Sequence, residues 1–272
     1  MQLYAFGLAL PRNPVQKGGM IADTVQQLET LTAAFAASQG DVSIIVQSKT
    51  DPAISVSINA AAKVPSASVI KTAIACAAAE LDLTKPTSKS DLDDTFYCSI
   101  LHAFDDGDQL TLKNLIGLML IVSDNPATSA VLDAIGMDKV NDWLARNGLA
   151  RSNLSIGFDD NALGAPLRAN LTTAEDCLKL LKIIDREPKY TFIKRMLANN
   201  LRNERIPKCL PDDAVIAHKT GTLAGLMHDI AIIESPVAAY YLVILGDGLE
   251  DDAKFARELA AFSDEVYALL SA

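Results

Sequence analysis

The sequence has few of the residues that mark several common protein classes. It contains only four cysteines, Cys76, Cys98, Cys177 and Cys209, with no Cys-x-x-Cys pair. Neither a zinc site nor a thioredoxin-like redox site is therefore indicated, and we expect free, buried thiols of a reducing compartment. The three histidines form no His-Glu-x-x-His motif. We accordingly expect no metal and no cofactor.

Positive charge is also scarce, with 24 Lys and Arg against 34 Asp and Glu and a net charge of −10. Nucleic-acid binding needs clustered Lys and Arg, so we expect a small-molecule partner and no nucleic acid. The longest run without a charged residue, 235–246, has 12 residues, whereas a membrane-spanning helix needs about 20.

Because the longest uncharged run is too short to cross a membrane, no membrane span is predicted. The N-terminus has a short apolar run without a leading positive charge or a clear cleavage site, so we predict no signal peptide. The compartment stays open between the cytoplasm and, after removal of a signal, the periplasm or the exterior. The oligomeric state is open too.

Strand-like segments lie at the two ends of the chain. Two β-branched runs, 42–47 and 53–59, are separated by the turn-forming SKTDP, which predicts an antiparallel hairpin. Three further runs at 214–220, 228–235 and 238–247 also read as strands. Since five strands are split by a long insertion, one sheet completed by distant segments is expected.

The segments between and outside these strands have helical patterns. This agrees with the composition, in which half of the residues are hydrophobic, many of them Ala and Leu, and only 6% are aromatic. Amphipathic helices are predicted at 22–38 and 255–270, and both are expected to cover one face of the sheet. The helices predicted between the strands are 69–83, 111–122, 126–135, 138–146, 172–185 and 190–201.

This order predicts an α+β fold with an inserted all-helical domain. We expect a sheet domain made of residues 1–62 and 212–272, a helical domain of residues 63–211, and a cleft at their junction.

The first chemical motif is Ser68-Val69-Ile70-Lys71. Residues i and i+3 share one helix face, so the Ser68 hydroxyl and the Lys71 amine are expected to meet. A desolvated lysine is a base able to activate a serine nucleophile. By itself, such a tetrapeptide is typical of a helix cap followed by a solvated lysine.

Two further motifs follow in the chain. Ser123-Asp124-Asn125 offers a hydroxyl and an amide, although alone it is typical of a helix stop. Lys219-Thr220-Gly221, followed by Thr222, places a cation and a hydroxyl where they can bind a carboxylate, and Gly221 allows close backbone approach. Alone it is typical of an exposed strand end.

Together the motifs, spaced by 55 and 96 residues, resemble the Ser-x-x-Lys, Ser-Asp-Asn and Lys-Thr-Gly set of class A serine β-lactamases and penicillin-binding proteins. The stretches 109–128 and 218–233 are similar to that family as well. The resemblance implies a β-lactamase-like fold with a five-stranded antiparallel sheet flanked by the terminal helices. It also implies a substrate that is a β-lactam or an acyl-D-Ala-like amide.

The resemblance also implies roles. Ser68 is expected to be the acylated nucleophile, Lys71 its base or proton relay, and Ser123 the group that passes a proton to the departing nitrogen. Substrate binding is expected at Asn125, Lys219, Thr220, Gly221 and Thr222. The backbone N–H groups of Ser68 and Thr222 would form an oxyanion hole.

The sequence departs from that family in the loop that carries its deacylating glutamate. The Glu-x-x-Leu-Asn pattern is absent, and its nearest echo begins at Asp160. Asp159 or Asp160 is therefore a candidate for activating water, although a solvated pair of loop carboxylates fits equally well. No arginine is matched to a second anchor for the substrate carboxylate, although Arg202 and Arg205 lie before the Lys-Thr-Gly strand.

Three functions stay open. The first is β-lactam opening through a Ser68 acyl-enzyme. The second is a penicillin-binding D-alanyl peptidase, or an amidase or esterase, with slow deacylation. The third is a non-hydrolytic module that binds a carboxylate ligand.

Overall fold

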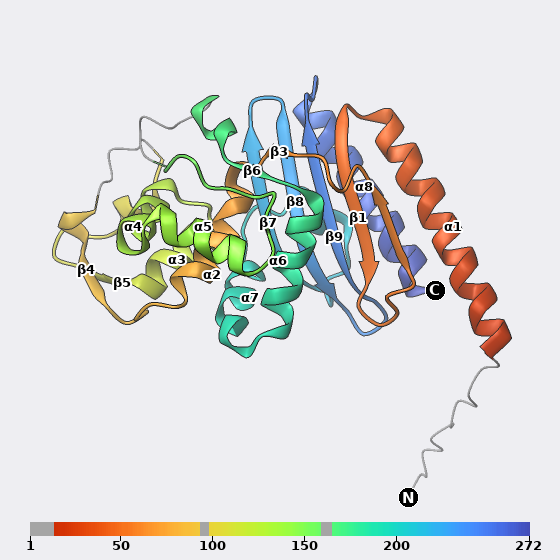
Figure 1. Cartoon of the computed structure of the whole chain (residues 1–272), viewed down its shortest axis with the longest axis horizontal. Coiled ribbons are helices and arrows are strands. Elements are labelled where there is room, and N and C mark those ends of the chain that lie inside the picture. Colours follow the sequence, from red (N-terminus) through yellow and green to blue (C-terminus); the bar gives the residue numbers. More distant parts are fainter. Residues whose placement is uncertain (1–13, 93–97, 159–164) are drawn as a thin grey trace, which may run out of the picture.

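A five-stranded sheet lies at the centre of the fold. The computed structural model describes residues 14–92, 98–158 and 165–272. The strands of the sheet are β1 (Asp41–Ser48), β2 (Ser55–Ile58), β7 (Val215–Leu223), β8 (Leu226–Glu234) and β9 (Ala239–Asp247). They run antiparallel in the order β2-β1-β9-β8-β7 (Figure 1). The predicted α+β class and antiparallel sheet are confirmed.

The central pair of strands joins the two ends of the chain. β1 pairs with β9 from Asp41 opposite Asp247 to Ser48 opposite Tyr240. The interior of β9 is buried at every position, because both faces of the sheet are covered. The hairpin of β1 and β2 has the pairing expected from the sequence.

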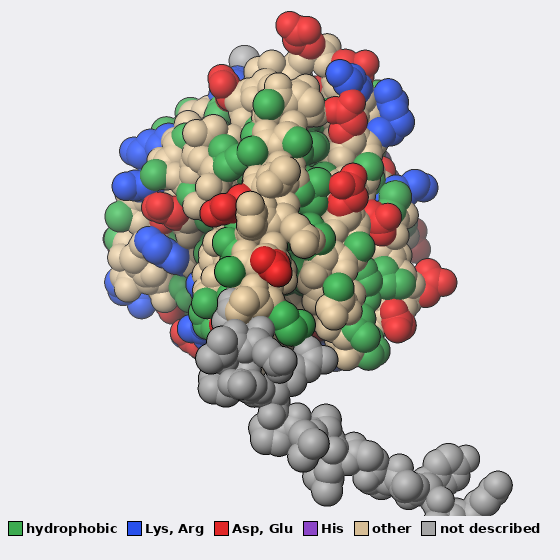
Figure 2. All heavy atoms as spheres, turned by 90° about the vertical axis from the view of Figure 1, so that its right-hand side faces the viewer, with side chains coloured by type: hydrophobic (Ala, Val, Ile, Leu, Met, Phe, Trp, Pro, Cys, Tyr) green, Lys and Arg blue, Asp and Glu red, His purple; other side chains and the backbone are tan. Residues whose placement is uncertain are grey.

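The terminal helices α1 (Pro14–Ser38) and α8 (Asp252–Ser271) cover one face of the sheet (Figure 1). Phe35 stacks on Phe262 with ring centroids 4.6 Å apart and lies 5.9 Å from Phe255. Charged side chains scatter among apolar and polar ones on the outer side of this end (Figure 2). The prediction that both terminal helices share one face is correct.

The helical part of the chain lies beside the other face and the β7 edge. Its helices are α2 (Lys71–Ala78), α3 (Leu112–Ile121), α4 (Asn125–Ile135), α5 (Met137–Arg146), α6 (Ala174–Arg186) and α7 (Thr191–Leu197). Thr111 caps α3 in a capping box with Asn114, and the Thr173 side chain caps α6. Short two-stranded pairs complete it: β3 (Val64–Pro65) with β6 (Leu171–Thr172), and β4 (Pro86–Ser88) with β5 (Gln109–Thr111).

The largest differences from the predicted helix boundaries are in three helices. α1 begins at Pro14 rather than 22, and proline is favourable at a helix start. α2 is shorter than 69–83, because a 3₁₀ turn, η1 (Ala67–Ile70), precedes it. α7 ends at Leu197, and beyond it the Asn200 side chain donates to the backbone carbonyls of Leu120 in α3 and His218 in β7.

The four thiols are free, but only two are buried. Cys76 and Cys177 lie in the core, whereas Cys98 and Cys209 are exposed. The expectation of four buried thiols is therefore half wrong. Burial raises the pKa of the Cys177 thiol to about 12, which makes that thiol unreactive.

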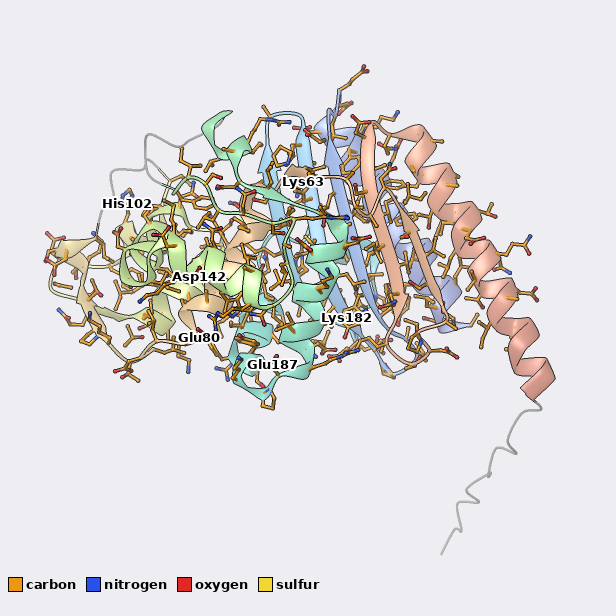
Figure 3. All side chains as sticks on the ribbon, viewed as in Figure 1. Lys63, Glu80, His102, Asp142, Lys182 and Glu187 are labelled. Atoms are coloured by element: carbon orange, nitrogen blue, oxygen red, sulfur yellow. The ribbon has the colours of Figure 1, made fainter. Side chains whose placement is uncertain are left out.

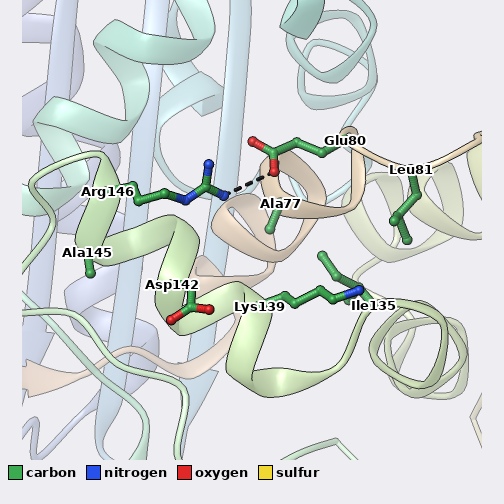
Figure 4. A pocket seen from close by; sticks show the side chains of 8 residues that line it. All are labelled: Ala77, Glu80, Leu81, Ile135, Lys139, Asp142, Ala145 and Arg146. Atoms are coloured by element: carbon green, nitrogen blue, oxygen red, sulfur yellow. Dashed lines mark hydrogen bonds and ion pairs between the residues drawn. The ribbon is translucent and has the colours of Figure 1, made fainter.

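No helix within the described residues is long and apolar enough to span a membrane. A hollow of about 480 Å³ lies between the end of α2 and α5, where Glu80 and Arg146 form an ion pair (Figure 4). Figure 3 labels Glu80 and Asp142, two residues that line this hollow. The hollow contains no residue of the three motifs, so it is not where their chemistry occurs.

Candidate active site

Ser68 lies in η1, where a tight backbone contact fixes its position. The backbone N–H of Ser66 donates to the Asn170 carbonyl at 2.6 Å, and Ala67 has a φ of +44°. A β-carbon at Gly221 would lie 3.2 Å from that of Ala67 and 3.3 Å from the Ser66 carbonyl. Gly221 therefore allows β7 to approach the segment that carries Ser68.

The turn between α3 and α4 presents Ser123 to the same place. Ser123 has a φ of +62°, a left-handed conformation that costs free energy in a non-glycine residue. Asp124 holds this turn: one carboxylate oxygen accepts from Ala127 N at 2.8 Å, and the other from Ser99 Oγ and Ile100 N at 2.9 and 2.7 Å. Asp124 thus links the motif to the segment near residue 100.

Lys71 connects α2 to this turn. Its buried amine donates to the Ser123 carbonyl at 2.8 Å and to Asn125 Oδ1 at 2.6 Å, and it lies 3.4 Å from Ser123 Oγ. The Phe158 ring lies 4.6 Å from the same nitrogen. Burial, and then the charge of Lys219, holds the pKa of Lys71 well below its ordinary value.

The expected contact between Ser68 and Lys71 is not among the hydrogen bonds of the described residues. The amine of Lys71 is directed to Ser123 and Asn125 instead. Ser68 lies in the 3₁₀ turn before α2, in which side chains at i and i+3 still share one face, so the bonds of Lys71 to the turn at Ser123, and not the helix type, direct its amine. The two side chains still belong to consecutive elements of one site.

Lys219 approaches Ser123 from β7. Its buried amine donates to Ser123 Oγ at 2.9 Å and to the Thr220 carbonyl at 3.0 Å. Burial, followed by the charge of Arg202, lowers the pKa of Lys219 to about 7. The Ser123 hydroxyl therefore lies between two buried amines that exchange protons more easily than ordinary lysines.

A buried arginine that the sequence left without a role holds the end of β7. Arg205 is 2% exposed, and its guanidinium donates to the carbonyls of Gly221 and His228 at 2.9 and 2.6 Å and to Thr222 Oγ1 at 2.6 Å. Thr222 itself is exposed at the site. The only signal in the sequence is the position of Arg205 shortly before the Lys-Thr-Gly motif.

Two more residues support the site, and no sequence signal pointed to the first of them, Phe158. Phe158 is buried against Lys71. The Asn170 side chain accepts from Ser155 N and Ile156 N at 2.8 and 3.0 Å and donates to the Ile156 carbonyl. Asn170 thereby binds the segment Ser155–Ile156, which precedes the two candidate aspartates in the sequence. Those aspartates, Asp159 and Asp160, lie outside the described residues.

The structure thus brings together members of all three motifs. The amine of Lys71 donates hydrogen bonds to Ser123 and Asn125. The amine of Lys219 donates to Ser123, and Gly221 lies against the turn that carries Ser68. No group of three His, Cys, Asp or Glu side chains suited to a metal occurs in the described part of the chain. A serine hydroxyl beside low-pKa amines and a cationic strand edge suits acyl transfer to serine from an anionic substrate.

This fold and site define a serine acyl-transfer hydrolase. The sequence model of the β-lactamase enzyme family matches residues 25–270, so the chain belongs to that family and is a serine β-lactamase-like hydrolase acting on a small-molecule substrate.

Solved structures share this fold. The TLA-1 extended-spectrum β-lactamase superposes with a TM-score of 0.81 at 19% identity, covering 92% of this chain and 100% of that one. A class A β-lactamase representative from Bacteroides cellulosilyticus DSM 14838 gives 0.78 at 21% identity, with 92% and 98% covered.

A third structure is a variant of the penicillin-binding protein PBP-A, which superposes with a TM-score of 0.75 at 20% identity, covering 91% of this chain and 96% of that one. A search of the curated proteins finds no match. At these identities the structural neighbours show the fold.

Proposed function

We propose that the chain opens β-lactam rings through an acyl-enzyme on Ser68. The observation that supports this most is the Ser123 hydroxyl placed between the buried amines of Lys71 and Lys219. PBP-A, one of the similar structures, is an acyl-enzyme complex with penicillin G. The same covalent state is proposed for this chain.

In the acylation step, neutral Lys71 takes the Ser68 proton, directly or through the Ser123 hydroxyl. The Ser68 oxygen attacks the lactam carbonyl, and the charge that develops on its oxygen is stabilised by the backbone N–H groups of Ser68 and Thr222. When the C–N bond breaks, Ser123 gives a proton to the nitrogen and recovers one from Lys71.

The edge of β7 and the turn between α3 and α4 provide the groups that bind the substrate. Cationic Lys219 binds the substrate carboxylate, and the Thr220 hydroxyl reaches it around the free edge of β7, the last strand of the sheet. Asn125 binds the side-chain amide. Gly221 lets the substrate lie close to β7. This pocket gives a protein with a net charge of −10 a local excess of positive charge.

We further propose that Asp159 or Asp160 activates the water that releases the product. Asp159→Asn and Asp160→Asn would then lengthen the life of the adduct without slowing its formation. If neither changes that lifetime, the proposed water-activating role is wrong. Where turnover is fast, antibiotic resistance follows.

The function is tested by hydrolysis of a chromogenic cephalosporin by the wild type, Ser68→Ala and the exposed control Ser90→Ala. We expect hydrolysis by the wild type and by Ser90→Ala, and none above background by Ser68→Ala. Equal rates for wild type and Ser68→Ala would contradict the assignment.

A further inference from the structure

A buried His–Asp pair lies behind the strand that carries Lys219. The Nδ1 atom of His218 lies 2.9 Å from Asp229 Oδ1, and the two side chains are 1% and 0% exposed. His218 precedes Lys219 in β7, and Asp229 of β8 is paired in register with Thr220. Because neighbouring residues of a strand point to opposite faces, the pair lies on the other face of β7 from the Lys219 amine.

The pair also fastens the segment 203–206 to the sheet. The second oxygen of Asp229 accepts from the backbone N–H of Ile206 at 3.2 Å. The Nε2 atom of His218 lies 3.1 Å from Asn203 Oδ1. Two attachments therefore bracket Arg205, whose guanidinium binds the Gly221 carbonyl and the Thr222 hydroxyl.

The charges around Lys219 are mostly of its own sign. Lys71 of α2 approaches the same Ser123 hydroxyl, and Arg202 and Arg205 come from the segment before β7. Asp229 acts in the opposite direction: it raises the pKa of Lys219 and that of Arg205. On the side of α4, Asp124 has the same effect on Lys71. His228, the other titratable neighbour on β8, is held neutral by burial, which lowers its pKa to about 4.

We propose that Asp229, held by His218, is a positioning residue of the active site with two roles. Its negative charge, placed behind β7, keeps Lys219 cationic, and its hydrogen bond to Ile206 fixes the segment that carries Arg205. The inference rests on the proposed function, since it concerns how the site binds an anionic substrate. A cationic Lys219 is needed for a substrate that bears a carboxylate and is dispensable for one that does not.

The test compares acylation rates of Asp229→Asn and the wild type as a function of pH, with penicillin G as the anionic probe and a p-nitrophenyl ester without a carboxylate as the neutral probe. For penicillin G, we expect the alkaline limb of Asp229→Asn to move to lower pH by about one unit, with about a tenfold loss of rate on that limb. For the neutral ester, the limb should stay in place.

Asp176→Asn is the matched control, because Asp176 is also 1% exposed and accepts hydrogen bonds from Arg151 N and Ser152 Oγ, neither of which belongs to β7 or to the segment before it. It should leave both profiles unchanged. His218→Gln keeps the carboxylate charge but loosens the segment, so the penicillin G rate should fall without movement of the limb to lower pH.

An unmoved limb in folded Asp229→Asn, or equal movement for both probes, would overturn the inference. If Asp229→Asn does not fold, His218→Gln decides: equal loss with both probes would overturn the inference, and loss with penicillin G alone would support it. A wild type that penicillin G does not acylate would instead overturn the proposed function, and this inference with it.

Discussion

Gly221 shows how one missing side chain shapes the site. A β-carbon there would press against Ala67 and the Ser66 carbonyl at 3.2–3.3 Å, so β7 or the Ser68 turn would have to move. We expect Gly221→Ala to slow acylation at least tenfold and to cost about 1–3 kcal/mol of unfolding free energy. Gly107→Ala, where a β-carbon meets nothing within 4 Å, is the control. Unchanged acylation kinetics in Gly221→Ala would contradict this account of the close approach.

His228 makes a second prediction at the level of a residue. Burial lowers its pKa to about 4, and its Nε2 atom lies 2.7 Å from the Pro65 carbonyl. Since the folded protein favours the neutral ring, its contribution to stability is full above the ordinary pKa of about 6.5 and is lost as the pH falls from there toward 4.

Thermal unfolding across this range checks that sign. We expect the difference in stability between the wild type and His228→Gln to shrink between pH 6.5 and 4. A difference that grows as the pH falls would show that the ring is protonated in the folded protein.

At the scale of elements, Asn170 joins the segment Ser155–Ile156 to the start of β6. Its side chain satisfies two backbone N–H groups and one carbonyl of Ser155 and Ile156, and it is fully buried. We expect Asn170→Leu to lower the unfolding free energy by about 2–3 kcal/mol, because those groups lose their partners. Asn170→Asp keeps the two acceptor contacts and should cost less, as urea unfolding would show. Equal losses would contradict this role of the amide.

The elements were largely predictable from the sequence because hydrophobic periodicity and turn residues are local signals. The five strands and the capping by Thr111 follow from such signals. The short α2 and the position of Lys71 do not, since they depend on the packing of α2 against α3, α4 and α5 and of η1 against β7. Arg205 was missed because its three partners lie 16 or more residues away. The division at residues 62–63 and 211–212 stays a prediction.

For the whole molecule, an ionic cluster joins the helical part to the sheet. Asp185 of α6 accepts from Lys49, which follows β1, from Lys194 of α7 and from Tyr241 of β9, each at 2.7 Å. Burial alone would raise the pKa of Asp185, but these hydrogen bonds lower it to about 2. The cluster therefore contributes stability above about pH 4, where the unfolded carboxyl is ionised, and loses it as the pH falls toward 2.

We expect Asp185→Asn to lower the unfolding free energy at pH 7 by about 1–3 kcal/mol. The exposed Asp142→Asn serves as the control and should change it by less than about 0.5 kcal/mol. The Asp185→Asn and wild-type curves should converge as the pH falls from 4 to 2. A constant gap over that range would contradict the assignment of the low pKa.

The central claim is that Ser68 becomes covalently acylated, and time-resolved intact-mass spectrometry after mixing with penicillin G tests it most directly. We predict a wild-type species heavier by the whole mass of penicillin G, located on Ser68 by peptide mapping, and no such species in Ser68→Ala. The decay of that species gives the deacylation rate. A wild type that shows neither an adduct nor penicillin hydrolysis, or an adduct of equal amount in Ser68→Ala, would contradict the account.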